Sequence, residues 1–202
     1  MCLRQDRPLF WDAWDVEIYH LETAQPLKFT DVKVSENGPV RASLSTQVKL
    51  SHSTVDVTIS LDAVPATTQG NSRSFFRFDS KVDWHQRHEI LKCTPTCVAI
   101  GICIFNSPSL TVELPVDIHS DNVYYETQWG HVSRPTHRNT SWDTAKFEVC
   151  GHKYADLSEY GYGVALLSES KYGFGTDGHT MRMSLLRAAT QPDAEQDQGL
   201  FM

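Results

Sequence analysis

The stretch Ala145–Arg187, AKFEVCGHKYADLSEYGYGVALLSESKYGFGTDGHTMRMSLLR, decides the fold, because short apolar runs alternate in it with glycine-containing turns. Within it, Ala145–Cys150 and Gly161–Ser168 are predicted strands. Near its end every second residue is apolar: Met181, Met183 and Leu185. A period of two is typical of strands that bury one face. The stretch therefore predicts several short β-strands.

The same period continues upstream. Asn122–Gly130 and Arg73–Trp84 both alternate between apolar and polar residues. The apolar positions of the second segment are Phe76, Phe78, Val82 and Trp84. Val40–Leu50 and Thr54–Val64 form a predicted hairpin around three polar residues. Many short strands at these intervals predict an all-β fold, an antiparallel β-sandwich.

Little of the chain has helical spacing. Asp12–His20 carries a short pattern of three and four residues, and Asp156 or Ser158 can cap only a brief turn. Val34–Pro39 and Pro65–Asn71 are rich in turn-forming residues and are predicted loops. Helices are therefore expected to be few and short.

Composition limits the function. The chain has 202 residues, 40% of them hydrophobic, and a formal net charge of -7. A negative chain without a basic cluster argues against nucleic acid and against an anionic membrane surface as partners. The longest apolar run, Cys97–Phe105, has about nine residues where a membrane-spanning helix needs about 20. Five scattered cysteines without a signal peptide indicate reduced thiols in a cytosolic protein.

Residues 93–111, CTPTCVAIGICIFNSPSLT, interrupt the pattern with an apolar run that holds three of the five cysteines. Joining Lys92 directly to Val112 gives the continuous phrase HEILKVELPVDIHSD. The segment has 19 residues, which correspond to an in-frame coding length typical of a short fungal intron. We interpret it as a translated retained intron rather than a functional loop.

Two motifs contain residues that could be metal ligands. His85 and His88 are three residues apart, as ligands on one face of a helix would be, but on a strand they would point to opposite faces. Cys93, Cys97 and Cys103 lack the paired knuckles of zinc sites. In both cases we favour the interpretation that the residues do not form a metal site.

Two other segments have the chemistry of sugar recognition. Trp11–Asp15, WDAWD, combines aromatic faces with carboxylates, although two tryptophans that pack onto a sheet are the favoured reading. Arg134–Asp143, RPTHRNTSWD, is the densest polar run. It can bind sugar hydroxyls or satisfy its own backbone, and the sequence does not separate these roles.

The best carboxylates for a glycosidase pair are Asp143, Asp156 and Glu159. Retaining glycosidases hold two carboxyl groups about 5 Å apart, which spacing in sequence does not reveal, so turn and cap roles are favoured. Gly161–Gly163 and Lys171–Gly175 are predicted glycine–aromatic turns, not phosphate-binding loops.

The long motif Gly130–Phe174, GHVSRPTHRNTSWDTAKFEVCGHKYADLSEYGYGVALLSESKYGF, resembles the C-terminal β-domain of family 38 α-mannosidases, most closely the fungal cytosolic or vacuolar type. The resemblance extends over Pro8–Lys92 and Val112–Gly199. It implies a galactose-mutarotase-like β-sandwich. It also implies a lead-in segment at 1–30, a β-domain at 31–199 and a truncated tail at 200–202.

This family consists of retaining, metal-dependent exo-α-mannosidases that usually hold zinc. Their nucleophile and metal ligands come from an N-terminal (β/α) barrel, and nothing here matches that barrel. The resemblance thus implies a fragment without catalytic or metal-binding residues, inactive alone, that needs the missing barrel as its partner. For the complete enzyme, the resemblance implies α-mannoside oligosaccharides as substrates, a place in the cytoplasm or vacuole, and assembly as a homo-oligomer.

From their loop chemistry, the residues expected at the rim of the mannose site are Arg134, His137 and Tyr172. The alternative is a free-standing β-sandwich that binds carbohydrate without turnover. The fragment reading predicts an exposed apolar face for the barrel, whereas the alternative predicts a self-sufficient core.

Overall fold

The computed structural model describes residues 2–10, 14–23, 25–27, 29–63, 76–93, 114–189 and 199–201. Its strands pair antiparallel throughout these residues, which confirms the predicted all-β class. The chain divides into two compact units. One comprises Met1–Leu27 and His88–Pro192, and the other comprises Lys28–Arg87 and Asp193–Met202. No helix in the described ranges is both long and apolar enough to span a membrane.

The larger unit contains two sheets. The first has the order β11-β14-β15-β7-β1-β2, with β8 also paired to β15. Its strands are β1 (Cys2–Gln5), β2 (Gln25–Pro26), β7 (Glu89–Cys93), β8 (Leu114–Pro115), β11 (Val149–Cys150), β14 (Gly173–Asp177) and β15 (Thr180–Arg187). The second has the order β10-β9-β12-β13. Its strands are β9 (Asn122–Thr127), β10 (Gly130–Pro135), β12 (Tyr154–Glu159) and β13 (Tyr162–Leu167).

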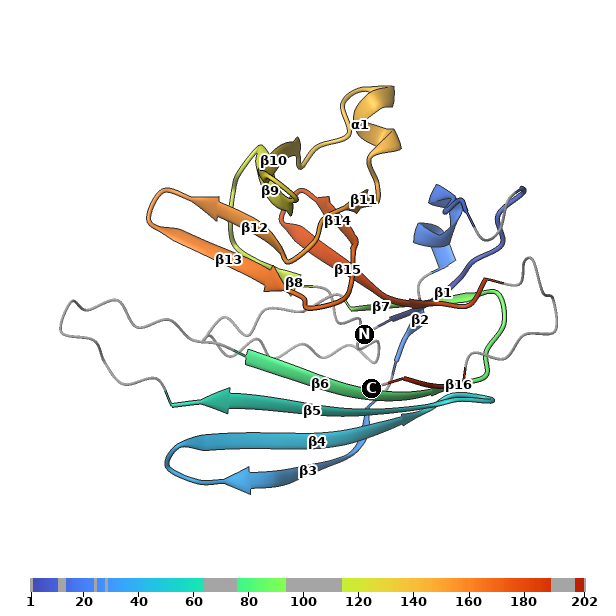
Figure 1. Ribbon diagram of the computed structural model, residues 1–202, viewed down its shortest axis with the longest axis vertical. Helices are drawn as coiled ribbons and strands as arrows, with labels where there is room; N and C mark the ends of the chain where they lie inside the picture. The colour runs from blue at the N-terminus through green and yellow to red at the C-terminus, as the bar shows by residue number, and fades with distance from the viewer. Residues whose placement is uncertain are drawn as a thin grey trace. The chain divides into compact units, whose positions relative to one another are not determined.

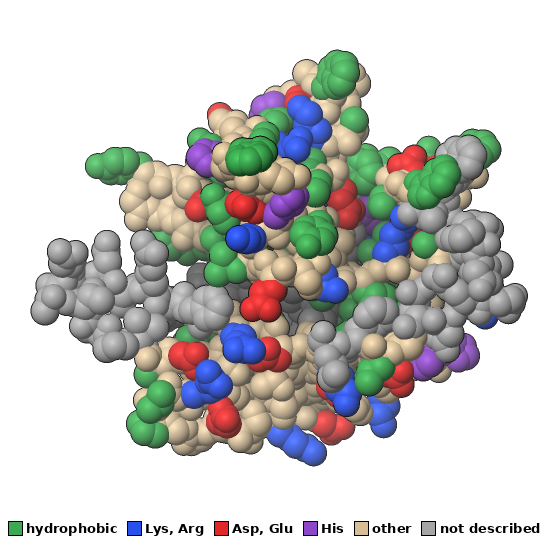
Figure 2. All heavy atoms as spheres, in the orientation of Figure 1, with side chains coloured by type: hydrophobic (Ala, Val, Ile, Leu, Met, Phe, Trp, Pro, Cys, Tyr) green, Lys and Arg blue, Asp and Glu red, His purple; other side chains and the backbone are tan. Residues whose placement is uncertain are grey.

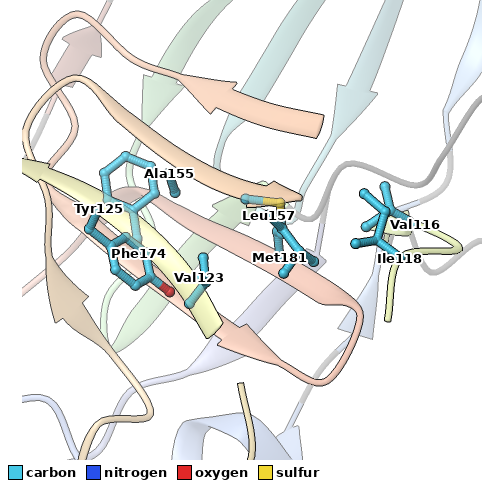
Figure 3. Close-up of a cluster of buried hydrophobic side chains, with 8 residues drawn as sticks. All are labelled: Val116, Ile118, Val123, Tyr125, Ala155, Leu157, Phe174 and Met181. Carbon is cyan, nitrogen blue, oxygen red and sulfur yellow. The ribbon is translucent and has the colours of Figure 1, made fainter. Parts of the chain in front are cut away.

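The two sheets of this unit enclose one hydrophobic core. Alternate residues of β9 and β12 point into it, and Phe174 and Met181 enter from β14 and β15. Figure 3 shows the rings of Tyr125 and Phe174 together at one end of the cluster. The core residues are Val116, Ile118, Val123, Tyr125, Ala155, Leu157, Phe174 and Met181. This packing of two sheets confirms the predicted sandwich for the larger unit.

The smaller unit is one sheet with the order β16-β6-β5-β4-β3. Its strands are β3 (Thr30–Asn37), β4 (Arg41–Lys49), β5 (Thr54–Asp62), β6 (Phe76–Trp84) and β16 (Gly199–Phe201). The predicted hairpin is confirmed as β4 and β5, and β3 to β6 form a meander in chain order (Figure 1). Lys, Arg, Asp and Glu side chains are interspersed over these strands in Figure 2.

One face of the smaller sheet is apolar at both ends of β5 but buried at only one of them. Val55 and Val82 are directly paired and buried. Four residues further along β5, Ile59 pairs with Phe78, which is 47% exposed, and with Leu44, which is 44% exposed. The predicted alternation of β6 is therefore confirmed, while burial of Phe76 and Phe78 is not.

Four sequence predictions are wrong at the level of elements. Ala145–Cys150 is not one strand, because α1 (Ser141–Ala145) precedes the two-residue β11. Val34–Pro39 is not a loop, since β3 continues to Asn37 through two register shifts. Asp156 and Ser158 lie inside β12 rather than at a cap. In place of a helix at Asp12–His20, a 3-10 helix spans Ile18–Thr23, and residues 11–13 lie outside the described ranges.

Strands β7 and β8 continue each other along β15. Met183 pairs with Cys93 of β7, and Met181 pairs with Leu114 of β8. Met181 and Met183 are two residues apart on β15, whereas their partners Leu114 and Cys93 are 21 residues apart. The segment that contains Cys93 and Leu114 is therefore 19 residues longer than the pairing requires. The surplus equals the length of the segment 93–111, most of which lies outside the described residues. The registers of β7 and β8 on β15 are therefore compatible with one strand if residues 93–111 are left out.

Two glycines of β14 allow Phe147 and Glu148, which follow α1, to approach this strand closely. A Cβ on Gly175 would lie 2.6 Å from the carbonyl oxygen of Phe147, and one on Gly173 would lie 2.7 Å from Oε1 of Glu148. Because real Cβ atoms do not approach so closely, only glycine allows the chain after α1 to pass here. This contact holds the polar loop and α1 near β14.

Candidate functional site

The polar run that follows β10 is anchored by Thr136. Its side-chain hydroxyl donates to the carbonyl of Ser120 at 2.7 Å, and its backbone N–H donates to the carbonyl of Asp121 at 3.0 Å. The N–H of Gly178 donates in turn to the Thr136 carbonyl at 2.7 Å. Thr136 is buried, so these bonds fix the base of the loop to both sheets of the larger unit.

The far end of the loop is fixed by the cap of α1. Thr140 Oγ1 accepts from the N–H of Asp143 at 3.2 Å and donates to Asp143 Oδ2 at 2.7 Å. The same carboxylate lies 3.7 Å from His137 Nδ1 and 3.9 Å from Lys146 Nζ. Asp143 is therefore engaged in the cap, which supports the structural reading of this carboxylate.

Between its two anchors the loop presents cationic and polar groups. Arg138 lies 3.1 Å from Asp177 Oδ2 at the end of β14, and Arg182 lies 3.9 Å from the same oxygen. His137 is exposed, with a side-chain exposure of 42%. Two guanidinium groups thus share one carboxylate beside an exposed imidazole, and the local charge is positive in a chain of net charge -7.

Arg134 is the penultimate residue of strand β10 and pairs with Val123 of β9. Both side chains therefore lie on the inner face of their sheet. It is half-buried, and its Nε has no hydrogen-bond partner among the described residues. Nearby, the Tyr125 hydroxyl is bonded to Thr176 Oγ1 at 2.8 Å. Burial raises the pKa of Tyr125 to about 12, against the opposing effects of the Thr176 hydrogen bond and the Arg134 charge.

The three predicted rim residues do not form one cluster. Arg134 near the end of β10 and His137 in the following loop lie toward the end of β14, whereas Tyr172 precedes the start of that strand. The Tyr172 carbonyl accepts from Gly151 N at 3.0 Å, and its ring meets the His152 ring edge-on at 5.6 Å. The five residues of β14 separate the two places by roughly 17 Å. Tyr172 is 56% exposed and belongs to a different end of the unit.

The other sugar-recognition candidates are dispersed. Trp11 and Asp12 lie outside the described residues, while Trp14 is 82% exposed and the Asp15 carbonyl accepts from Arg187. Glu159 Oε2 accepts from His119 N at 2.9 Å. Asp143 and Glu159 thus have structural partners, whereas Asp156 Oδ1 is buried without a hydrogen-bond partner among the described residues. None of these contacts joins two of the three predicted acids.

Within the ranges that the structure describes, no three His, Cys, Asp or Glu side chains are grouped so that they could hold a metal ion. His85 pairs with Asp83 at 3.0 Å, and Cys97 and Cys103 lie outside those ranges. The residues present therefore do not fit the metal that the family resemblance implies, and we derive no chemical step through it.

A buried polar cluster escaped the sequence analysis. His20 is 2% exposed, and its Nε2 lies 3.8 Å from Glu148 Oε2. Ser184 donates to the other oxygen of Glu148. The serine bonds the carboxylate and not the imidazole, so the order of contacts is not that of a nucleophile activated by a base. The cluster connects the 3-10 helix Ile18–Thr23 to β15. Sequence spacing gives no signal for it, because its members are far apart along the chain.

Comparison with known proteins gives a consistent result. The profile described as glycosyl hydrolases family 38 C-terminal domain matches residues 2–195. Alpha-mannosidase 2C1 of Homo sapiens is 39% identical over 200 residues, covering 98% of this chain and 17% of the relative. Alpha-mannosidase of Saccharomyces cerevisiae is 40% identical over 196 residues, covering 96% and 16%. Alpha-mannosidase G of Dictyostelium discoideum is 38% identical over 199 residues, with the same coverages. The chain thus spans about a sixth of the length of these relatives.

Proposed function

This chain belongs to glycosyl hydrolase family 38 through its C-terminal domain, and from that premise we propose that it is the β-domain of an α-mannosidase. The complete enzyme would remove terminal α-mannosyl residues from oligosaccharides with retention of configuration. Three curated relatives with α-mannosidase names, each matched over nearly all of this chain, support the proposal.

The observation that carries the chain's own role is the double-anchored loop between Thr136 and Thr140. Its ends are fixed by buried backbone contacts and by a helix cap, while the His137 side chain between them is 42% exposed. A rigid loop with an exposed imidazole is suited to bind sugar hydroxyls. We propose that Arg134 and His137 contribute to the rim of a mannose site, with Tyr172 at a separate place on that rim.

Catalysis is assigned to a domain outside this chain. Glycoside hydrolysis needs two carboxyl groups about 5 to 10 Å apart on either side of the glycosidic bond. The described carboxylates Asp143 and Glu159 instead bond a helix cap and a backbone N–H. The nucleophile and the divalent metal, which we propose to be zinc, would come from an N-terminal barrel. The chain by itself would be inactive.

The exposed end of the smaller sheet supports a partner domain. The paired residues Leu44, Ile59 and Phe78 form a cross-strand row, and the neighbouring row contains Leu61 and Phe76. Exposed apolar rows of this kind are typical of surfaces that pack against another folded body. We propose that this body is the catalytic barrel, that the enzyme is a homo-oligomer, and that it resides in the cytoplasm or vacuole.

The rim is tested by kinetics in a chimaera, the yeast relative with its 196 matched residues replaced by this chain. Arg134→Ala and His137→Ala should each raise KM for an α-mannoside about tenfold, because each removes a hydrogen bond to substrate. Ser133→Ala, at the exposed neighbouring position, is the control and should leave KM unchanged. Unaltered KM in both rim variants, or a folded chimaera without activity, would contradict the proposal.

A second candidate function is carbohydrate binding without turnover. Trp129, at the turn between β9 and β10, is 100% exposed, and Tyr172 is 56% exposed. Exposed aromatic faces of this kind stack on pyranose rings. Titration of the chain with mannose, followed by tryptophan fluorescence, tests this candidate. Saturable binding that Trp129→Ala abolishes would favour it, and a flat titration would exclude it.

A further inference from the structure

Among the strands that the structure describes, β13 is an open edge of the four-stranded sheet. It pairs with β12 over six consecutive residues without a register shift. Its sequence, YGVALL, contains no charge and no proline. Tyr162 and Leu167 at its ends are 51% and 57% exposed, and Ala165 between them is also exposed. The strand therefore presents an accessible and regular backbone on the side away from β12.

Two other edges of the described sheets, β10 and β3, carry protective features. β10, at the opposite edge of the same sheet, carries Arg134 and ends in Pro135. β3, the edge of the smaller sheet, carries three charged residues and two register shifts. Charges, proline and irregular pairing are the usual devices that prevent an edge from pairing with another chain. β13 has none of them.

The turn before β13 shows which backbone groups face outward. Tyr160 and Gly161 form a two-residue turn, in which the Tyr162 N–H points toward the Glu159 carbonyl. Because hydrogen-bonded positions alternate along an antiparallel strand, the N–H and C=O groups of Gly163, Ala165 and Leu167 point away from β12. Side chains of the intervening residues Val164 and Leu166 pack on the core.

We propose that β13 pairs with β13 of a second copy of this chain, antiparallel about a two-fold axis through Ala165. Gly163 of each copy then lies opposite Leu167 of the other, so a small residue faces a large one on both sides of the axis. The three outward residues of each copy exchange about six hydrogen bonds. No like charges meet along the strand, and the eight strands of the two copies form one continuous sheet.

This inference names the surface of the homo-oligomer proposed above and otherwise rests on the edge strand, not on glycosidase activity. Sedimentation analysis and hydrolysis are independent measurements, so failure of one proposal is distinguishable from failure of the other.

The test is sedimentation velocity of the 202-residue chain over a range of concentrations. The wild-type chain should show a monomer–dimer equilibrium. Ala165→Lys should raise the dimer Kd at least about tenfold, because two lysines then meet at the axis. Ser133→Lys is the matched control, since Ser133, Tyr124, Asp156 and Ala165 form one cross-strand row from edge to edge. It should leave Kd unchanged.

A second variant tests the backbone directly. Ala165→Pro removes an outward N–H and leaves the bonds to β12 in place, so it should weaken the dimer as strongly as the lysine variant. Circular dichroism verifies that each variant keeps its β-structure. A chain that stays monomeric, an Ala165→Lys variant that dimerises like the wild type, equal weakening by Ser133→Lys, or assemblies larger than a dimer would each overturn the inference.

Discussion

At the scale of single residues, Tyr125 connects the two sheets of the larger unit. Its ring packs with Phe174, with ring centroids 6.1 Å apart, and its hydroxyl bonds Thr176 across the sandwich. The residue is 2% exposed, so its hydroxyl stays neutral far above the pH at which an exposed tyrosine ionises. This single side chain therefore contributes to packing, to hydrogen bonding and to the pH dependence of stability.

We expect Tyr125→Phe to lower the free energy of unfolding by about 1 kcal/mol near neutral pH, because Thr176 loses its partner. The folded pKa of Tyr125 is raised to about 12 from an ordinary value of 10.0. The unfolded state therefore releases its proton first, and stability falls as pH rises from about 10 through about 12. The loss attributable to this group approaches about 3 kcal/mol.

Urea unfolding between pH 8 and 12 measures both effects. The Tyr125→Phe variant should lack this part of the alkaline decline. Tyr162→Phe, at a half-exposed position, is the control and should decline like the wild type. Parallel declines in wild type and Tyr125→Phe would show that the account of this tyrosine is wrong.

The sequence indicated which residue types could bind a ligand, but it did not indicate which of these residues lie close together in space. The composition of the run Arg134–Asp143 indicated donors for a ligand, and the structure places Arg134 near the end of β10 and His137 in the loop that follows. Tyr172 lies apart because a full strand separates it from that loop, which spacing along the chain does not reveal. The cluster of His20, Glu148 and Ser184 was unpredictable for the same reason, since only tertiary packing joins its members.

At the scale of elements, alternation predicted β6, β9 and β15, and the predicted segments Thr54–Val64 and Gly161–Ser168 coincide with β5 and β13. Other signals explain the failures. Thr140 and Asp143 have the spacing of a capping box, and this local signal starts α1 where periodicity alone suggested a strand. β3 escaped because its two register shifts break the period of two. Propensity and alternation describe regular elements well and irregular edges poorly.

We expect Thr140→Ala to destabilise the larger unit by about 1 kcal/mol, because the variant loses the side chain that caps α1. Urea unfolding measures the cost, and amide hydrogen exchange in 141–146 should accelerate. Ser141→Ala, one residue later, removes a hydroxyl outside the cap and should cost much less. Equal costs for the two variants would argue against the cap.

At the scale of the whole molecule, the interpretation of residues 93–111 as an insertion stays a prediction, while β7 and β8 both pair with β15. The boundaries of the two units were not predictable, because the chain leaves the larger unit at Leu27 and returns to it at His88. Such discontinuous organisation depends on long-range pairing such as that of β1 with β7. The proposed division into 1–30, 31–199 and 200–202 stays a prediction.

Deletion of residues 93–111 should stabilise the chain, since Lys92 would then join Val112 in a single strand of unbroken register on β15. Removing a 19-residue loop relieves a closure entropy of about 2–3 kcal/mol. Thermal unfolding measures the change, and the midpoint should rise. A deletion variant that fails to fold, or whose midpoint falls, would show that the segment is a structural part of the domain.

The central claim is that this chain is a β-domain whose catalytic groups lie elsewhere in a longer α-mannosidase. The most direct measurement is the hydrolysis of 4-nitrophenyl α-mannoside by the purified 202-residue chain, with and without added zinc. We expect a rate equal to that of buffer under both conditions. Hydrolysis that co-purifies with the chain and disappears on its denaturation would contradict the claim, because it would place a complete glycosidase site within these residues.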